Sequence, residues 1–248
     1  VKACCAPGIR AEVLEGTVNA DEEDFLRRIV DASPDVVGFC CTIWNIRVVE
    51  QLLFAVKHAL PRAAVVVGGP EVSFRASAWM RENPSCDYAV KGEGERAFAA
   101  LLSGLAAGGD VSSIPGLCYR GADGAVYENE PEQLTGDPPD PYGAEYFAAL
   151  GGRIAYIETS RGCPFSCTFC LSGRKDAVRF FDLARAKRDL LRLAVSGTKT
   201  IKFVDRTFNC DRRRSREIWR YIIESFSGME TCFHFEVFPA LLEDEDFR

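Results

Sequence analysis

Residues 36–70 read VVGFCCTIWNIRVVEQLLFAVKHALPRAAVVVGGP, and this stretch decides the class of the fold. Val36–Cys41 is a run of β-favouring residues without a polar face, which is typical of a strand buried on both sides in a parallel sheet. Apolar residues then recur at helical spacing from Ile46 to Leu60, and Ala64–Val67 forms a second strand-like run. A strand, a helix and a strand in this order predict a parallel α/β sheet.

The pattern continues on both sides of this unit. Ala11–Glu15 is predicted to be a strand, and Asn19 is predicted to cap the helix that follows it. Tyr88–Lys91 is the next predicted strand, and the helix after it ends at Gly108. These elements predict a Rossmann-like (flavodoxin-like) domain over residues 1–110.

The start of the chain lacks the strand expected at the centre of such a sheet. Residues 1–6 resemble the end of a helix, which Pro7 and Gly8 would close. Because a doubly wound sheet begins with a central strand, we expect that strand to precede residue 1. The first domain is therefore predicted to be truncated at its N-terminus.

Residues 111–150 change in character and are expected to link two domains. Leu117–Arg120 and Ala125–Glu128 flank an Asp-Gly turn, which predicts a β-hairpin. Prolines at positions 131, 138, 139 and 141 follow, and they favour an extended connection.

The order of strand and then helix resumes in residues 151–248. A long loop is expected at 160–175, strands at Ile154–Thr159, Thr200–Asp205 and Cys232–Val237, and helices at Leu183–Val195 and Arg213–Phe226. Three such units cannot close a barrel on their own. Residues 151–248 are therefore predicted to be the first βα units of a TIM-type barrel that is truncated at its C-terminus.

Composition disfavours several classes of protein. The 248 residues carry a formal net charge of −6, which argues against a general nucleic-acid binder, and the basic run Arg212–Arg214 is interpreted as a solvated helix face. No apolar run is long enough to span a bilayer and no signal peptide opens the chain, so we expect no membrane partner and a cytoplasmic location. The 11 cysteines indicate a reducing compartment and thiols that bind metal.

Cys163, Cys167 and Cys170 form the pattern C-x-x-x-C-x-x-C in the loop after the first strand of the second domain. Ligands of α/β folds bind in such loops. Three thiolates at this spacing can hold three irons of a 4Fe–4S cluster and leave the fourth iron open. The alternative is a zinc site, which needs a fourth ligand and would have to recruit the distant Cys210 or His234.

The motif and its neighbouring segments resemble the radical SAM superfamily, in particular the subgroup that contains a cobalamin-binding domain. The resemblance covers nearly the whole chain, and its segments come in the expected order. Besides the cysteines and Phe169 just before the last of them, the segments are GFCCTIWN (38–45), VGGPEV (67–72), KGEGE (91–95), ETSRGC (158–163), RFF (179–181), KFVDRTFN (202–209) and HFE (234–236).

The resemblance implies a radical SAM enzyme. A 4Fe–4S cluster on the three cysteines would reductively cleave S-adenosylmethionine (SAM) to a 5′-deoxyadenosyl radical, with an electron from a donor such as flavodoxin or ferredoxin. Phe169, Asp205 and Glu236 would contact SAM. For the two carboxylates the alternative is an ion pair with an arginine of the loops.

The resemblance also implies cobalamin as a second cofactor, bound by the loops that follow the strands of the first domain. Glycine in these loops would let the backbone approach a bulky ligand. His58 and His234 are not credible cobalt ligands, because the first lies on a predicted helix and the second lies in the other domain. The residues expected to hold cobalamin are Thr42, Gly68, Gly69, Gly92, Glu93 and Gly94.

The implied reaction is methyl transfer, or another radical transformation, of an unidentified small-molecule or peptide substrate. A radical SAM methylthiotransferase is an alternative, but it would need cysteines for a second cluster in the first domain. Cys41 could serve as one, whereas Gly68-Gly69-Pro70 stands where another is required. A non-catalytic corrinoid or iron–sulfur sensor, an electron carrier and a zinc-stabilised structural protein are the remaining interpretations.

Overall fold

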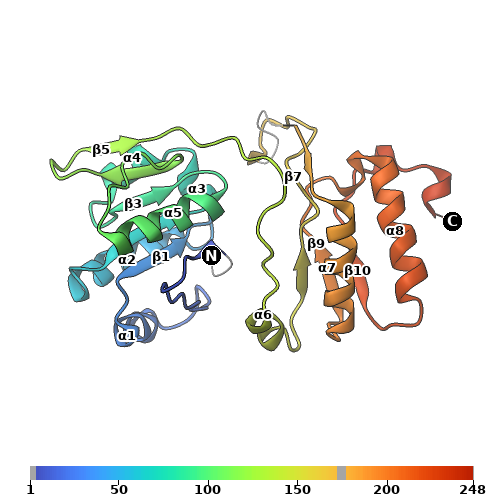
Figure 1. The fold of residues 1–248 in the computed structure, drawn as a ribbon, viewed down its shortest axis with the longest axis horizontal. Coiled ribbons are helices and arrows are strands. Elements are labelled where there is room, and N and C mark those ends of the chain that lie inside the picture. The colour runs from blue at the N-terminus through green and yellow to red at the C-terminus, as the bar shows by residue number, and fades with distance from the viewer. Residues whose placement is uncertain (1–3, 172–176, 248) are drawn as a thin grey trace. The chain divides into compact units, whose positions relative to one another are not determined.

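The computed structural model describes residues 4–171 and 177–247. The chain divides into two compact units, Val1–Leu134 and Thr135–Arg248 (Figure 1). Two predictions lie partly outside the described residues. They are the end of a helix at 1–6, of which residues 1–3 are not described, and the loop at 160–175, of which residues 172–175 are not described.

The first unit is built on a five-stranded sheet in the order β1-β2-β3-β4-β5. The first three strands are parallel, as the sequence predicts, and the last two are antiparallel. The predicted hairpin forms, but it extends this sheet instead of lying in a linker, because β4 pairs with β3. The strands are β1 (Val36–Cys40), β2 (Ala64–Gly68), β3 (Tyr88–Val90), β4 (Leu117–Arg120) and β5 (Val126–Glu128).

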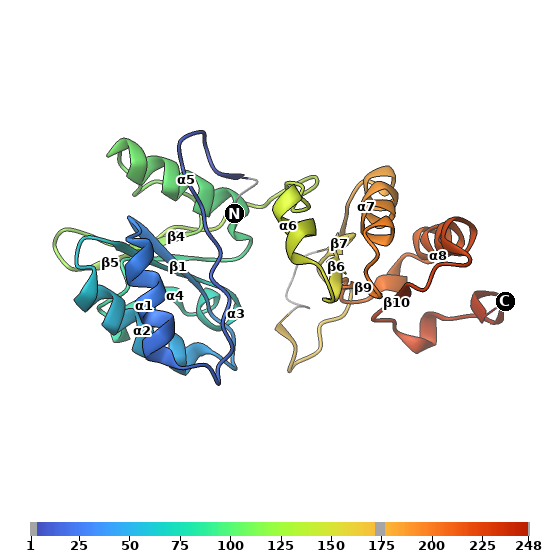
Figure 2. The same cartoon turned by 90° about the horizontal axis from the view of Figure 1, so that it is seen from below.

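Helices cover both faces of this sheet, and α5 lies on the side opposite to α1 and α2 (Figure 2). Side chains of β2 alternate between two cores: Val65 and Val67 pack with α1, α2 and α4, while Val66 packs with α5. This alternation explains why β2 is apolar at every position. The helices are α1 (Glu22–Ala32), α2 (Ile46–Ala59), α3 (Pro70–Ser73), α4 (Ala76–Glu82) and α5 (Gly94–Ala107).

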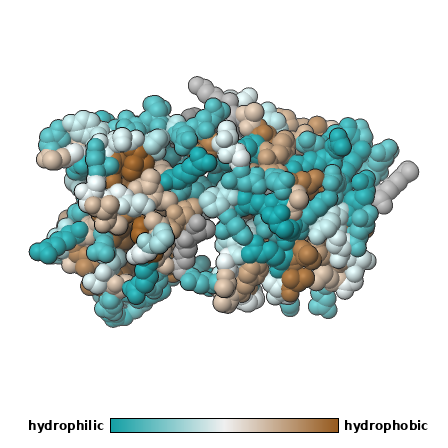
Figure 3. Space-filling view, viewed as in Figure 1, coloured by the Kyte–Doolittle hydropathy of each residue, from teal (hydrophilic) through white to brown (hydrophobic). Residues whose placement is uncertain are grey.

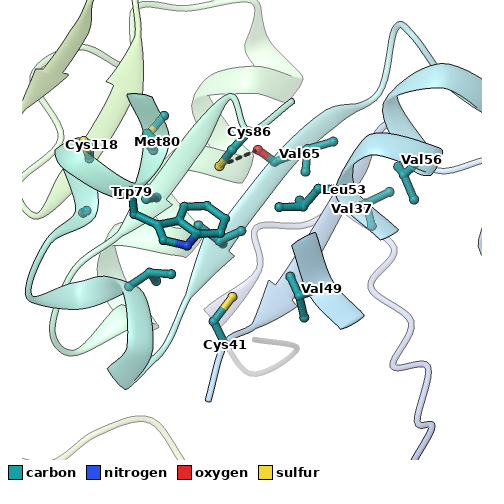
Figure 4. Close-up of a cluster of buried hydrophobic side chains, with 14 of the residues drawn as sticks. Val37, Cys41, Val49, Leu53, Val56, Val65, Trp79, Met80, Cys86 and Cys118 are labelled. Atoms are coloured by element: carbon teal, nitrogen blue, oxygen red, sulfur yellow. Dashed lines mark hydrogen bonds between the residues drawn. The ribbon is translucent and has the colours of Figure 1, made fainter. Parts of the chain in front are cut away.

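Three cysteines are part of the larger core of the first unit. Cys41, Cys86 and Cys118 are fully buried and belong to the same cluster of buried side chains as Trp79 (Figure 4). The Cys86 thiol also contacts the carbonyl oxygen of Tyr88 at 3.2 Å. These thiols act as small apolar groups. In contrast, Cys40 is exposed, because successive side chains of a strand point to opposite faces.

Two expectations for the start of the chain are wrong. Residues 11–15 form no strand: Leu14 packs against the core, but Val13 is 66% exposed and the segment pairs with no strand in the described part of the chain. Helix α1 is capped by Asp21 instead of Asn19, because the Asp21 carboxylate accepts hydrogen bonds from the N–H groups of Glu23 and Asp24.

The second unit contains a parallel three-stranded sheet in the order β10-β9-β6. Ile157 and Phe203 on one face pack into a core with α7 and α8, whereas Tyr156 on the other face is 52% exposed. Helices on one face of a parallel sheet are the arrangement expected of the first βα units of a barrel. The elements are α6 (Ala144–Ala149), β6 (Ala155–Ile157), β7 (Ser160–Arg161), β8 (Arg179–Phe180), α7 (Leu183–Val195), β9 (Thr200–Phe203), α8 (Arg212–Phe226) and β10 (Cys232–His234).

No helix within the described residues has the length and apolar character needed to cross a membrane. On the face shown in Figure 3, hydrophobic residues form small areas among hydrophilic ones.

Gly69 illustrates how tightly the ends of β1 and β2 are packed. Its backbone has φ +106° and ψ 171°, a region that is essentially restricted to glycine, and a Cβ atom there would lie 2.5 Å from the Cys41 carbonyl oxygen. We predict that Gly69→Ala lowers the free energy of unfolding by about 3 kcal/mol or more, as strain and clash add.

Gly92→Ala is the matched control, because Gly92 also has a positive φ (+65°) but a Cβ there would meet nothing within 4 Å. Its cost should be about 1–2 kcal/mol, from backbone strain alone. Urea unfolding of both variants, followed by circular dichroism, measures the difference. Equal losses would contradict the packing described here.

Candidate functional site

The three motif cysteines lie in a loop that is closed at its base by a two-residue ladder. Ser160 of β7 pairs with Phe180 of β8, and Arg161 pairs with Arg179. The N–H of Phe181 also donates to the carbonyl of Thr159 at 3.0 Å. Both ends of the loop are thereby attached to the carboxyl end of β6, the edge at which α/β barrels bind ligands.

The thiols of the loop are accessible and chemically suited to an iron–sulfur cluster. Cys163 and Cys170 are half-buried, Cys167 is exposed, and none of them forms a disulfide. In the described residues, no group of three or more His, Cys, Asp or Glu side chains is arranged to hold a metal ion. The structure therefore does not show a preassembled centre, but three thiols from one loop are the donor set that a cluster with one open iron requires. The assignment of the three cysteines remains a prediction.

A buried carboxylate fixes the position from which this loop departs. Asp205, which follows β9, is 1% exposed. Its Oδ2 accepts a hydrogen bond from the Thr159 N–H (2.9 Å), and its Oδ1 accepts from the hydroxyls of Thr159 (2.7 Å) and Ser160 (2.6 Å). Burial raises the pKa of Asp205, and the hydrogen bonds from Ser160 and Thr159 oppose this rise.

Arg214 of α8 provides a second tie to the same strand end. Its Nη2 donates to the Thr159 carbonyl at 3.2 Å, and its guanidinium lies 5.5 Å from the centre of the Phe180 ring. Burial lowers the pKa of Arg214, while nearby carboxylates, first among them Asp205, oppose this shift. This role is not predicted from the sequence, because Arg214 lies within a basic run that is interpreted as a solvated helix face.

The segments after β9 and β10 each contact the loop at one further point. The Thr207 hydroxyl lies 3.3 Å from the Cys163 sulfur, and the Phe165 ring packs at 4.7 Å against the Phe238 ring. Asn209 connects these points, since its side chain donates to the Phe238 carbonyl (3.0 Å) and accepts from the Phe238 N–H (2.9 Å). The segment KFVDRTFN (202–209) is part of the family resemblance, but the contacts of Thr207 and Asn209 could not be inferred from the sequence.

The residues predicted to contact SAM occupy different environments. Phe169 is 91% exposed. Asp205 is buried and engaged by Thr159 and Ser160, not by the arginine considered as an alternative. Glu236 follows β10, with its Oε1 3.7 Å from the Lys202 ammonium. Asp205 and Glu236 do follow neighbouring parallel strands, as expected, but their contacts with SAM remain predictions.

In the first unit, the predicted cobalamin residues lie at or just after the carboxyl ends of β1, β2 and β3, and Gly68 is the last residue of β2. Gly69 is required by the packing of its own chain, because it lies against the Cys41 backbone. Gly92 is different, because the space on its Cβ side is open. Gly68 has ordinary contacts with Val90, and Glu93 and Gly94 are half-buried.

Thr42 offers an observation that fits a bulky polar ligand. Its hydroxyl oxygen is buried and has no hydrogen-bond partner, while its N–H donates to the Asn45 side chain at 2.7 Å. The next two side chains, Ile43 and Trp44, are 76% and 72% exposed. A buried polar atom without a protein partner, beside two exposed apolar side chains, suits a corrin ring that carries amide groups. Ile43 and Trp44 are not predicted as binding residues from the sequence, although two large apolar residues directly after a strand can indicate a ligand-binding loop.

Comparisons with known proteins identify relatives of this chain. Residues 1–102 match the family model of the B12 binding domain. An uncharacterized methyltransferase of Pyrococcus horikoshii is 31% identical over 210 residues, which are 79% of this chain and 44% of that protein. The cobalamin-dependent radical SAM methyltransferase TokK of Streptomyces tokunonensis is 36% identical over 151 residues, which are 55% of this chain and 22% of that protein.

A solved structure shares the fold. The radical S-adenosylmethionine methyltransferase TsrM from Kitasatospora setae, with cobalamin and a 4Fe–4S cluster bound, has a TM-score of 0.64 at 20% identity. The match covers 82% of this chain and 43% of that one. The chain thus spans less than half the length of each of these relatives.

Proposed function

Because this chain belongs to the subgroup of the radical SAM superfamily that contains a cobalamin-binding domain, we propose that it binds a 4Fe–4S cluster, SAM and cobalamin for methyl transfer. The observation that carries the proposal is the three-cysteine loop, which is fixed at the carboxyl end of a parallel sheet in the same chain as a match to the B12 binding domain. The substrate would be a small molecule or a peptide, and a flavodoxin or ferredoxin would donate the electron.

In the second unit, the chain's own residues would position the cofactors and exclude water. Cys163, Cys167 and Cys170 would hold three irons. When bound, the cluster would supply the electron that cleaves SAM to methionine and a 5′-deoxyadenosyl radical. Asp205 would hold the start of the loop in place through its hydrogen bonds with Thr159 and Ser160. The exposed ring of Phe169 would pack against the adenine of SAM.

In the first unit, cobalamin would bind over the carboxyl ends of β1 and β3. The Thr42 hydroxyl would gain a hydrogen-bond partner, and Ile43 and Trp44 would lose contact with water against the corrin. The open space beside Gly92 would admit the ring or its side groups. When bound, cobalamin would supply a carrier for the methyl group.

The geometry disfavours the methylthiotransferase alternative. Cys41 would have to serve as a ligand of a second cluster, but it is fully buried in the core. Burial raises its pKa to about 12, so the thiolate that metal binding requires is disfavoured. Burial also raises the pKa of Cys210, one of the two candidates for a fourth zinc ligand, so that its thiol form is favoured when no metal is bound.

We predict that replacing all three motif cysteines with alanine abolishes the cluster and the formation of 5′-deoxyadenosine. The full chain would be purified without oxygen, reconstituted with iron and sulfide, reduced with dithionite in the presence of SAM, and assayed by chromatography. Cys232→Ala is the matched control, because Cys232 is exposed and lies outside the motif in the same unit.

The control should keep wild-type iron, acid-labile sulfide and 5′-deoxyadenosine. An unchanged yield of 5′-deoxyadenosine in the triple variant would refute the proposal. A cluster in the wild-type protein without any cleavage of SAM would favour a sensor or an electron carrier.

We also predict that Gly92→Leu weakens the binding of hydroxocobalamin by about tenfold or more, because the new side chain fills the open space at the strand ends. Gly124→Leu is the matched control. Gly124 has a similar backbone (φ +79°) and equally open surroundings, but it lies in the hairpin turn between β4 and β5. Equilibrium dialysis with detection of the corrinoid spectrum measures both affinities, and equal affinities would place cobalamin elsewhere.

A further inference from the structure

The hydroxyl of Thr207 is aimed at the sulfur of a motif cysteine. Its Oγ1 lies 3.3 Å from the Cys163 Sγ, within hydrogen-bond range for sulfur, and Thr207 is only 6% exposed. Contact with water therefore does not compete strongly for the hydroxyl. The Thr207 hydroxyl therefore makes a direct contact with a motif sulfur, although Thr207 lies outside the loop that carries the motif.

The turn that carries Thr207 is held on several sides, so its hydroxyl is placed before any ligand binds. The Phe208 N–H donates to the Glu236 carbonyl at 2.9 Å, and the centre of the Phe208 ring lies 4.9 Å from that of Phe203 and 4.6 Å from that of Phe235. Asn209 is doubly hydrogen-bonded to the Phe238 backbone. A donor on such a turn loses little conformational freedom when it makes a hydrogen bond.

The direction of this hydrogen bond follows from the chemistry of a cluster ligand. A cysteine that binds iron is a thiolate and has no proton to donate, so the Thr207 hydroxyl must be the donor. Reduction adds one negative charge to the cluster, part of which resides on its sulfurs. A donor to sulfur therefore stabilises the reduced state more than the oxidised state, and it raises the reduction potential.

We propose that Thr207 is a positioning residue of the cluster, whose hydroxyl donates a hydrogen bond to the Cys163 thiolate and raises the cluster's reduction potential. The inference rests on the proposed function, since it requires a cluster on Cys163. It goes beyond that function by assigning to a residue outside the motif a part in setting how readily the electron donor can reduce the cluster.

The test compares three variants of the full chain, reconstituted without oxygen and titrated in the absence of SAM, with the reduced cluster detected by electron paramagnetic resonance. Thr207→Val removes the hydroxyl and keeps the shape, and Thr207→Ser keeps the hydroxyl. Thr198→Val is the matched control, because Thr198 is also 6% exposed but precedes β9, and its hydroxyl donates to the Arg153 carbonyl at 3.0 Å.

Thr207→Val should lower the equilibrium constant for one-electron reduction by about tenfold, which corresponds to about 59 mV. Thr207→Ser and Thr198→Val should keep the wild-type potential. Loss of the cluster from Thr207→Val alone, with normal iron and sulfide in the other two variants, would also support the contact.

Equal potentials in all four proteins would overturn the inference, as would equal shifts in Thr207→Val and Thr198→Val. Neither result would affect the proposed function, because each requires an intact cluster in the wild-type protein. If the wild-type protein itself bound no iron and sulfide, the proposed function would fail, and the inference would fail with it.

Discussion

The position of the cysteine loop depends on one buried carboxylate. Asp205 follows β9 and receives three hydrogen bonds from Thr159 and Ser160, the residues between β6 and the cysteines. A carboxylate without these donors would be costly to bury, and the hydroxyls without the carboxylate would lose their acceptor. Because Arg214 holds the Thr159 carbonyl from α8, the loop departs from a point that three elements of the second unit define.

Both units use the carboxyl ends of parallel strands, but they use them differently. In the first unit the edge proposed to bind cobalamin has open space at Gly92, a buried Thr42 hydroxyl without a hydrogen-bond partner and an exposed Trp44. In the second unit the edge anchors a loop, and the cysteines proposed to bind the cluster lie on that loop. This difference agrees with a bulky cofactor in one unit and a small inorganic cluster in the other.

Local sequence patterns predicted the parts of the fold that depend on local interactions. Helix α7 has the predicted bounds, and both ends of β1, β2 and β3 lie within one residue of the predicted positions. These predictions succeed because the spacing of apolar residues indicates which positions are buried, and glycine and proline mark where helices and strands end. Residues 11–15 resemble a strand in sequence, but in the described part of the chain they pair with no strand. The roles of Asp205, Arg214 and Thr207 arise from contacts between residues more than 40 positions apart, and local sequence patterns do not reveal such contacts. Gly69 and Gly92 look alike in sequence, and only the packing around them separates a structural glycine from one beside open space.

The central claim is that three sulfurs of one loop hold a cluster whose fourth iron accepts SAM. Electron paramagnetic resonance of the dithionite-reduced full chain, recorded with and without SAM, tests this claim most directly. A ligand that binds the open iron must change the g values of the reduced cluster, and we predict that change. A cluster signal that is identical in both samples, at SAM concentrations that saturate related enzymes, would contradict the account.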